Sequence, residues 1–579
     1  MRLEDYWGVG PKTAARLEET LGTAAAIEAI DSADVGALTR AGLSRGRATA
    51  ILRRAQDGDR LDVLATRDAR SVYKDLLSLA RSHAVTEDAA DRISVLTPLG
   101  DPEAMRERTA STLAAAETWR ALSDADREAV LSAFETHDDG EDPRLAAVET
   151  ALALAAVGVD REPLDVVASL PTDDLEAAAE ALRTGDGDTV RPGADAELDR
   201  LRERRAAADR LADGALDVLE SVRADGARDL GTFREELIEH VIAETGIEGS
   251  VVREATPDDA ASAADFVSGT LRTLAETTRE AAAARERELL AEANETLDAT
   301  AEAVERTERA VADAALTLSL GRFAAAYELR RPQLVPDGDV LAVTEARNLS
   351  LAAAGGDVQP VSYAVGDHDL GTAPSGDAVT VLTGANSGGK TTLLETLCQV
   401  AILAQLGLPV PADRATVGVV DAVVFHRRHA SFNAGVLEAT LRAIVPPLAG
   451  GGRTLMLVDE FEAITEPGSA AALLHGLVSL TVDRGAVGVF VTHLADDLKP
   501  LPDPARIDGI VAQGLTSDLA LQVDYQPRFG EVGRSTPEFI VSRLVADARD
   551  PTERAGFEAL ARALGRTAVQ TTLFDDRFT

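Results

Sequence analysis

The sequence predicts a multidomain protein of the α and α/β classes. It would hold a small all-α hairpin domain, a long helical core with an antiparallel coiled-coil arm, and an α/β domain with a mostly parallel sheet. Three observations predict this. Glycine-containing turns between short helical runs recur near the N-terminus, Ala/Glu/Arg/Leu-rich helical sequence fills the middle, and apolar strand-like runs alternate with helical runs after about residue 338. At 579 residues the chain has room for three or four domains.

Residues 1–57 are the predicted hairpin domain. The stretch 7–14 reads W-G-V-G-P-K-T-A before a helical run, and 41–48 is a looser copy. The pattern resembles the paired helix-hairpin-helix motif, in which a Gly-x-Gly turn points backbone amides at one DNA phosphate. The resemblance implies DNA contact at Gly8, Gly10, Lys12, Gly42 and Gly46. The alternative is a hairpin domain that serves only for protein docking. Directional N–H contacts suit a high-salt cell, since at molar salt the Debye length is about 3 Å.

Residues 65–334 are the predicted helical core. Two helical runs, about 194–242 and 260–314, flank a turn-like segment at 244–250. A helix of fifty residues is roughly 75 Å long. The simplest arrangement is an antiparallel two-helix arm over about 194–314, and the alternative is a compact bundle of the same helices.

Residues 335–549 are the predicted α/β domain. Strand-like runs lie at 379–382, 419–425, 455–458 and 487–491. Between the first run and a helical run from Leu393 to Leu406 lies G-x-x-x-x-G-K-T. A strand, a glycine-rich loop and a helix together are typical of a phosphate site, rather than of a chance glycine-rich turn. The predicted ATP-binding residues are Gly384, Ala385, Asn386, Ser387, Gly388, Gly389, Lys390, Thr391 and Thr392.

Two later strands end in groups that suit nucleotide chemistry. Thr391 and Asp459 are the predicted Mg²⁺ ligands. The predicted catalytic residues are Lys390, which reaches the β- and γ-phosphates, Glu460, which orients or deprotonates water, and His493, which senses the γ-phosphate. Any strand can end in Asp-Glu, and a single histidine is more often structural. Their order after the phosphate loop favours the functional interpretation.

The amino-acid composition indicates the salt concentration and the cellular compartment in which the protein works. With 98 Asp+Glu against 58 Lys+Arg the formal charge is −40, and the only lysines are Lys12, Lys74, Lys390 and Lys499. This acidity resembles that of proteins from salt-loving archaea, so we interpret it as solvent adaptation. One cysteine, Cys398, and a charged N-terminus without an apolar run lead us to expect a cytoplasmic protein with no membrane span.

Residues 383–391, T-G-A-N-S-G-G-K-T, resemble the T-G-P-N-x-G-G-K-[ST] motif of the MutS family of DNA-associated ATPases, with Ala385 in place of proline. Residues 459–467 are similar to the D-E-x-G-x-G-T-D-P of the branch without mismatch reading, with Glu462 and Ile464 at the glycine positions. Thr492-His493 matches the next strand's T-H. The resemblance extends over about 70–545.

This resemblance implies an ABC-type P-loop ATPase domain, ATP and Mg²⁺ as ligands, and a homodimer with composite ATP sites. It aligns Ser431 with a residue that completes the partner's site. Tyr363 could stack on adenine, but the alternative that we favour is a strand-edge tyrosine without a ligand. The expected function is ATP-dependent binding of duplex or branched DNA, with little sequence specificity, in repair or recombination. The alternatives are an ATP-binding scaffold with negligible turnover and a structured-RNA or ribosome-associated ATPase.

Residues 550–579 are the predicted C-terminal tail. Gln570, Leu573 and Phe574 resemble the peptide with which proteins dock on the archaeal sliding clamp, in a segment that runs to Phe578. The alternative is a frayed chain end.

Overall fold

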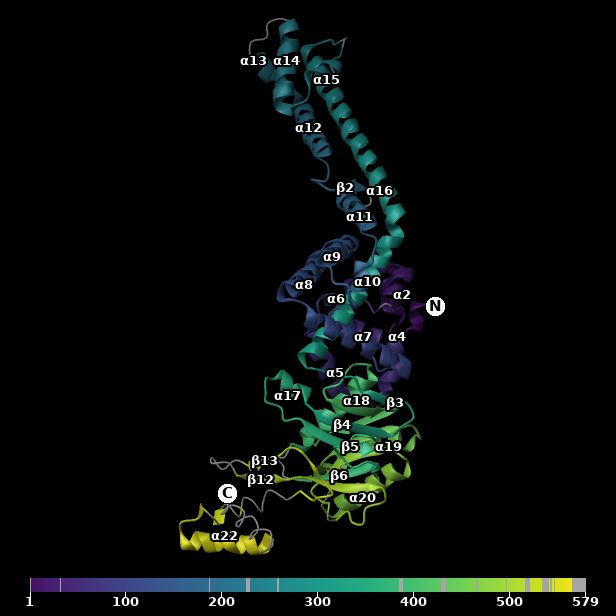
Figure 1. Cartoon of the computed structure of the whole chain (residues 1–579). Helices are drawn as coiled ribbons and strands as arrows, with labels where there is room; N and C mark the ends of the chain where they lie inside the picture. The colour runs from purple at the N-terminus through teal and green to yellow at the C-terminus, as the bar shows by residue number, and fades with distance from the viewer. Residues whose placement is uncertain are drawn as a thin grey trace. The chain divides into compact units, whose positions relative to one another are not determined.

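The structure is a computed structural model (Figure 1). It describes residues 2–564 apart from 32, 187, 225–229, 258–259, 385–388, 429–433, 465–466, 496, 516–520, 534–540, 542–543 and 546. The chain forms two compact units. One holds residues 1–131, 161–163 and 312–579, and the other holds 132–160 and 164–311.

The first unit begins with a small helical domain. A short 3-10 helix, η1 (Leu3–Asp5), precedes α1 (Pro11–Leu21), α2 (Thr23–Asp31), α3 (Val35–Arg40) and α4 (Arg45–Asp57). These short helices enclose a core of their own that includes Leu17, Ile30, Leu38 and Ile51. The domain lies against α6 (Glu87–Ser94), where Arg45 pairs with Asp91 and with Glu87, at 3.1 Å from Glu87 Oε2.

A short connection joins this helical region to the α/β part of the same unit. Helix η2 (Gly58–Val63) leads to α5 (Arg67–Arg81), which Thr66 caps through the Ala69 N–H. The Thr66 hydroxyl also donates to the Phe425 carbonyl at 2.6 Å, so the start of α5 is fixed to a strand of the main sheet. Helix α7 (Pro102–Ala121) follows.

The second unit contains the rest of the helical core. Its elements up to the arm are most of α8 (Asp124–Asp139), then α9 (Pro143–Val157), α10 (Asp165–Ala168), α11 (Thr172–Thr184) and the short strands β1 (Gly185–Asp186) and β2 (Thr189–Val190). The arm follows with α12 (Ala196–Asp213), α13 (Ala215–Ala224), α14 (Leu230–Thr245), α15 (Gly249–Glu254) and α16 (Ala263–Ala326), whose last residues belong to the first unit.

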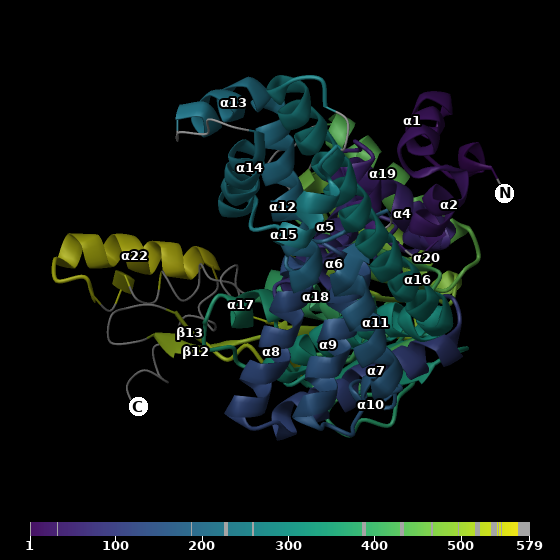
Figure 2. The same cartoon turned by 90° about the horizontal axis from the view of Figure 1, so that it is seen from above.

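The prediction of one continuous helix over 194–242 is wrong. The first helix ends at Gly214, a poor helix former, whose N–H bonds back to the Arg210 carbonyl. Beyond it, α13, α14 and α15 pack around the start of α16 in a small bundle built on Phe233, Leu237 and Phe266, seen in two views (Figures 1 and 2). The predicted long second helix is confirmed as α16.

Helices α12 and α16 run antiparallel, as the arm prediction expects. Arg202 Nη2 lies 2.6 Å from Glu286 Oε1, and Arg279 Nη2 lies 2.9 Å from Asp209 Oδ1. Residue numbers therefore rise along α12 while they fall along α16. The structure thus combines the two alternatives of the sequence analysis: a two-helix stem that ends in a small bundle.

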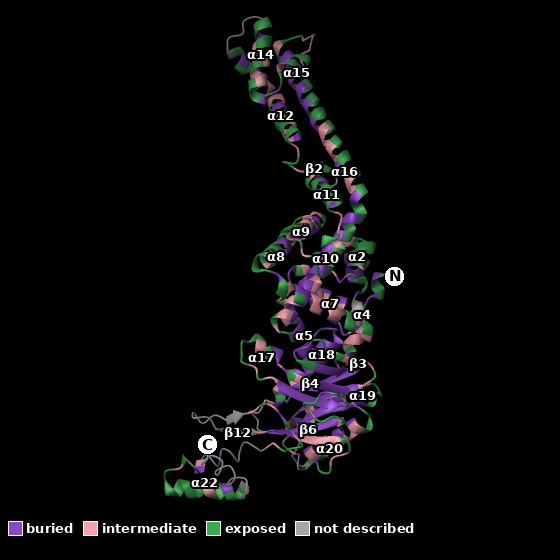
Figure 3. Cartoon of the chain, in the orientation of Figure 1, coloured by how far each residue is buried: buried purple, intermediate pink, exposed green. Residues whose placement is uncertain are grey.

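The α/β part contains a six-stranded sheet. Its order is β14 (Arg528–Phe529), β11 (Ala505–Ile510), β6 (Val379–Gly384), β10 (Val487–Val491), β9 (Thr454–Asp459) and β8 (Ala422–His426). Every neighbouring pair is parallel except β11 with β14, so the predicted mostly parallel sheet is confirmed. One face packs on α18 (Lys390–Gln405), and the other on α19 (Ala434–Ala449) and α20 (Pro467–Asp483). The central strands β6, β10 and β9 are buried along their whole length (Figure 3).

A second sheet was not predicted from the sequence. It has the order β3 (Gln333–Val335), β7 (Arg414–Gly418), β4 (Val340–Ala346) and β5 (Val361–Gly366), and α17 (Leu349–Ala353) lies between β4 and β5 in the chain. It shares the core of α18 through Leu341, Val343 and Tyr363. The remaining elements are η3 (Phe461–Ile464), the antiparallel pair β12 (Ala512–Leu515) and β13 (Leu521–Val523), and α22 (Pro551–Leu564). Among the described residues, no helix is both long and apolar enough to cross a bilayer.

Candidate nucleotide-binding site and hairpin pair

The phosphate-loop sequence lies between β6 and α18. Strand β6 ends at Gly384, and α18 begins at Lys390 after Gly389, whose φ of 74° is left-handed. Residues 385–388, with the predicted Ala385, Asn386, Ser387 and Gly388, lie outside the described residues. A Cβ at Gly384 would lie 2.5 Å from the Ile510 carbonyl oxygen, so only glycine fits where β6 leaves the sheet.

Lys390 is buried at the start of α18, with its ammonium folded back toward the loop. Its Nζ donates to the Gly384 carbonyl at 2.7 Å and lies 3.9 Å from Glu460 Oε1. Burial lowers the pKa of Lys390, and the nearby carboxylates oppose that shift. The lysine is therefore held at the loop as a cation that phosphate oxygens can use.

Asp459 ends strand β9 directly opposite Thr391. The Thr391 hydroxyl donates to Asp459 Oδ2 at 2.6 Å, and Asp459 is fully buried. Burial raises the pKa of Asp459, while the Thr391 hydrogen bond lowers it. Its other oxygen, Oδ1, is buried without a hydrogen-bond partner among the described residues. A hydroxyl and an unsatisfied carboxylate oxygen side by side fit a Mg²⁺ ion that takes its other ligands from phosphate and water.

Glu460 lies beside both groups, with each of its oxygens engaged. His493 Nε2 lies 2.9 Å from Oε1, and Arg428 Nη1 lies 2.7 Å from Oε2. The hydrogen bond to His493 is the largest of the effects that lower the pKa of Glu460. The backbone of Glu460 has a φ of 41°, which is unusual for a residue with a side chain, and its N–H donates to the Val491 carbonyl at 3.0 Å.

Glu462, at a position where the resembling motif has glycine, supports His493 from behind. Its Oε1 accepts hydrogen bonds from the His493 N–H at 2.7 Å and from the Thr492 hydroxyl at 2.8 Å. In the sequence, Glu462 stands out only as a departure from the motif. In the structure it fixes the end of β10, and thereby the position of the His493 side chain.

A cavity of about 410 Å³ opens beside the first turn of α18. Its wall includes Gly389 to Thr392 at one end, and Leu351, Asn348 and Tyr525 further along. Tyr525 is 42% exposed, and its ring lies against Gly389, where a Cβ would be 2.7 Å from Tyr525 Cδ1. This volume suits a nucleoside-sized group. Tyr525 was missed in the sequence because no local motif surrounds it.

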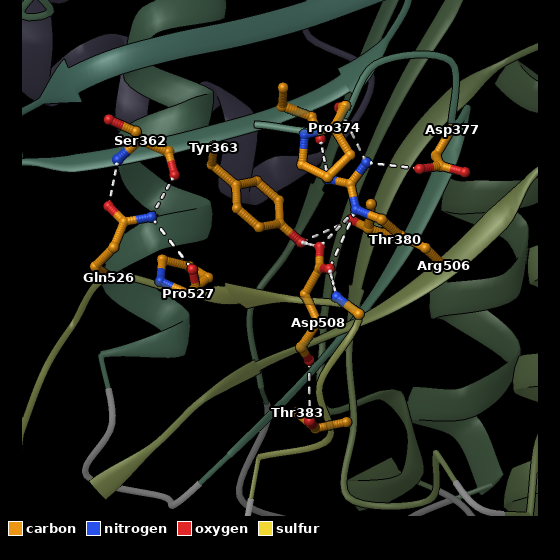
Figure 4. A network of polar contacts seen from close by, with 12 residues as sticks. Ser362, Tyr363, Pro374, Asp377, Thr380, Thr383, Arg506, Asp508, Gln526 and Pro527 are labelled. Atoms are coloured by element: carbon orange, nitrogen blue, oxygen red, sulfur yellow. Dashed lines mark hydrogen bonds and ion pairs between the residues drawn. The ribbon is translucent and has the colours of Figure 1, made fainter. Parts of the chain in front are cut away.

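Tyr363 is not placed to stack on adenine, which was the less favoured of its two interpretations. Its side chain is fully buried, and its hydroxyl lies 2.8 Å from Asp508 Oδ2 and 2.9 Å from Thr380 Oγ1 (Figure 4). Burial raises the pKa of Tyr363 well above its usual range, and the Asp508 carboxylate adds to the rise. The alternative, a strand-edge tyrosine without a ligand, agrees with its place on the edge strand β5.

This polar network lies directly behind the phosphate loop. Arg506 Nε donates to Asp508 at 3.0 Å, and the Gly530 N–H donates to the other Asp508 oxygen at 3.0 Å. The Thr383 hydroxyl, one residue before the loop, donates to the Asp508 carbonyl at 2.9 Å (Figure 4). The network therefore joins the end of β6 to β11 and to the segment that carries Tyr525.

The N-terminal hairpins form a pair with reciprocal contacts. Gly8 and Gly42 have φ values of 80° and 86° at equivalent places in the two turns. Arg16 Nη1, from the first half, donates to the Gly42 carbonyl at 3.0 Å, and Arg47 Nη2, from the second half, lies 3.4 Å from the Gly8 carbonyl oxygen. The two halves are thus related by an approximate twofold exchange of contacts.

Gly46 does not occupy the place in the second hairpin that Gly10 has in the first. Gly10 precedes α1 as its N-cap, and its counterpart before α4 is Ser44, whose carbonyl accepts the same pair of helical N–H groups. Gly46 instead lies in the first turn of α4. Gly8, Gly10, Lys12 and Gly42 are exposed on this domain. A role of these residues in DNA contact stays a prediction.

The α/β part is a P-loop domain. Three features define it: a parallel sheet, a lysine at the start of the helix after β6, and Asp-Glu at the end of β9. Residues 380–446 match the family model of MutS domain V. The resemblance to the MutS family described from the sequence is therefore confirmed for this part of the chain.

Known relatives match parts of the chain. It is 46% identical over 221 residues to the DNA-binding protein MutS2 of Pyrococcus furiosus, which is 38% of each chain. It is 32% identical over 172 residues to the endonuclease MutS2 of Thermus thermophilus, covering 29% of this chain and 23% of the relative. Over 266 residues it is 28% identical to the DNA mismatch repair protein MutS of Natronomonas pharaonis, covering 43% and 30%. The chain thus spans 38% or less of the length of each of these relatives.

Besides residues 385–388, two further predicted features lie outside the described residues. They are Ser431, which the resemblance places at a partner's ATP site, and the segment from Gln570 to Phe578.

Proposed function

We propose that the chain is a Mg²⁺-dependent ATPase that binds DNA with little sequence specificity and acts in DNA repair or recombination. The observation that carries the ATPase part is the convergence of five residues from the ends of two neighbouring parallel strands, β9 and β10, and from the start of α18: Lys390, Thr391, Asp459, Glu460 and His493. Groups of this kind at the carboxyl ends of parallel strands are where an α/β protein binds its ligand.

In this proposal Thr391 and the unsatisfied Asp459 oxygen hold Mg²⁺, which would neutralise phosphate charge when bound. Lys390 binds the β- and γ-phosphates. Glu460 orients the attacking water and accepts its proton, and His493 holds the Glu460 carboxylate in place. The base and sugar of the nucleotide occupy the cavity beside Gly389, against Tyr525.

ATP hydrolysis in molar KCl tests this assignment. Glu460→Gln keeps the size of the side chain but removes the charge, so turnover should fall by about 10²–10⁴-fold while ATP still binds. Turnover should also stop when EDTA removes Mg²⁺. Equal turnover by the wild type and Glu460→Gln would refute the catalytic assignment, and no turnover in the wild type would favour an ATP-binding scaffold.

The DNA part rests on the hairpin pair and on the name of one relative, the DNA-binding protein MutS2 of Pyrococcus furiosus. The exposed turn around Gly8 and Gly10, followed by Lys12, suits contact with a backbone phosphate. The acidic character of the chain makes a diffuse electrostatic attraction to DNA weak, so directional contacts would have to supply the affinity.

A pair of charge reversals tests the hairpins. Lys12→Glu should weaken duplex binding by about tenfold or more at a fixed KCl concentration, because a phosphate contact becomes a repulsion. Lys74→Glu changes an equally exposed lysine, on α5, and serves as the matched control. If the two variants bind DNA equally well, the hairpins do not make the contact.

The remaining expectations of the sequence analysis are also part of the proposal. Stimulation of turnover by duplex or branched DNA, rather than by structured RNA, separates the DNA hypothesis from a ribosome-associated one. A homodimer would give twice the chain mass by light scattering in the presence of ATP. Deletion of 570–579 should remove binding to the sliding clamp if the tail docks there.

A further inference from the structure

Among the described residues, Arg428 is a charged group at the phosphate site that the proposed function leaves unused. It lies two residues beyond the end of β8 at His426, and its side chain is 52% exposed. Its Nη1 lies 2.7 Å from Glu460 Oε2, whereas Lys390 and His493 both face the other oxygen, Oε1. Arg428 and Lys390 therefore lie on opposite oxygens of one carboxylate.

The neighbouring Arg427 has a different, structural role. Its N–H donates to Asp68 Oδ2 at 2.8 Å, and its guanidinium pairs with Glu395 at 3.0 Å and lies over the Phe425 ring. These contacts fix the end of β8 against α5 and α18. Arg428 is thus presented to the site from an anchored backbone, with only its side chain free to change partner.

The pairing of Arg428 with Glu460 is exchangeable on physical grounds. An ion pair with a half-exposed arginine contributes little stability because water screens it. A terminal phosphate offers more charge and more acceptor oxygens to a guanidinium than a carboxylate does, and guanidinium binds it in a bidentate fashion. A phosphate held by Lys390 must lie close to Glu460, because the ammonium of Lys390 is 3.9 Å from Glu460 Oε1.

We propose that Arg428 binds the terminal phosphate of ATP and so distinguishes ATP from ADP. It exchanges the Glu460 carboxylate for the γ-phosphate, and this exchange leaves Glu460 Oε2 open to the attacking water. A nucleoside diphosphate places no phosphate at this point, so Arg428 then stays on Glu460. The inference rests on the proposed function, because it assigns to Arg428 the discrimination between substrate and product of the same site.

The test is the ratio of ATP to ADP affinity, measured in EDTA and molar KCl by displacement of a fluorescent ADP analogue. Arg428→Gln should weaken ATP binding by about tenfold and leave ADP binding within about twofold. Arg428→Lys, which keeps the charge, should recover part of the ratio. Arg442→Gln is the matched control, since Arg442 is an exposed arginine in an ion pair on α19, with Glu438.

Each outcome decides the inference separately from the proposed function. An ATP-to-ADP ratio that Arg428→Gln leaves unchanged, or an equal loss of both affinities, overturns the role of Arg428 even if the wild type hydrolyses ATP. A ratio that falls in Arg428→Gln alone supports it even if wild-type turnover proves negligible. A wild-type protein that binds neither nucleotide, in EDTA or with Mg²⁺ present, refutes both.

Discussion

Replacing Tyr363 with phenylalanine tests whether the buried network behind the phosphate loop stabilises the P-loop domain. The substitution removes one hydroxyl that lies 2.8 Å from Asp508 Oδ2, and both residues are fully buried. A hydrogen bond to a charged group contributes about 1.5–3 kcal/mol, and water cannot replace the lost donor at this site. Since every 1.4 kcal/mol is tenfold, the population of opened molecules should rise by roughly ten- to hundredfold.

The single cysteine of the chain provides the assay. Cys398 is fully buried on α18, and it shares one apolar core with Tyr363. Its rate of modification by a thiol reagent therefore reports how often this core opens. The measurement needs no other label and works in molar KCl, where the labelling rate of Tyr363→Phe should exceed that of the wild type by the same factor.

Tyr327→Phe is the matched control. Tyr327 packs edge-on against Phe323 with ring centroids 5.6 Å apart, and its hydroxyl has no hydrogen bond to a described residue. Its loss should change the labelling rate by less than about twofold. If Tyr363→Phe labels no faster than this control, the network does not carry the stability assigned to it.

Three further predictions concern single groups. Burial raises the pKa of the Cys398 thiol, so the native protein should react with a thiol reagent more than about a thousandfold slower than the unfolded chain. Burial, together with the nearby Arg322, lowers the pKa of His83, so the unfolded chain binds more protons than the folded chain near that pKa. The free energy of unfolding should therefore fall as the pH drops through the usual histidine pKa. This fall should be smaller in His83→Asn. Asp91→Ala leaves Arg45 without its most buried partner, and should cost about 1 kcal/mol, seen as faster hydrogen exchange in α4.

Local sequence patterns predicted the strands and the helix that surround the phosphate loop. The strand before Lys390, the helix after it, and the strands that end at Asp459 and before His493 all lie where the apolar runs indicated. Each of these features is contained in about ten consecutive residues. The parallel order of the strands then brings the side chains together, because carboxyl ends meet at one edge of the sheet.

The features that the sequence did not predict depend on distant partners. The strands of the second sheet are short, and β4 is held by pairing with β5 and with β7, which lies about seventy residues further along the chain. The burial of Tyr363 depends on Asp508, and Tyr525 reaches the cavity only because its segment returns to α18. The break at Gly214 was hidden because the helical composition continues on both sides.

The reciprocal arginines of the hairpin pair make each half depend on the other half for its stability. Each half supplies the side chain that holds the other half's turn, Arg16 for Gly42 and Arg47 for Gly8. Two separate copies of one hairpin could make the same exchange of contacts as a dimer. A fragment with one half alone would lack its clamp, so it should fold only by recruiting a second copy of itself.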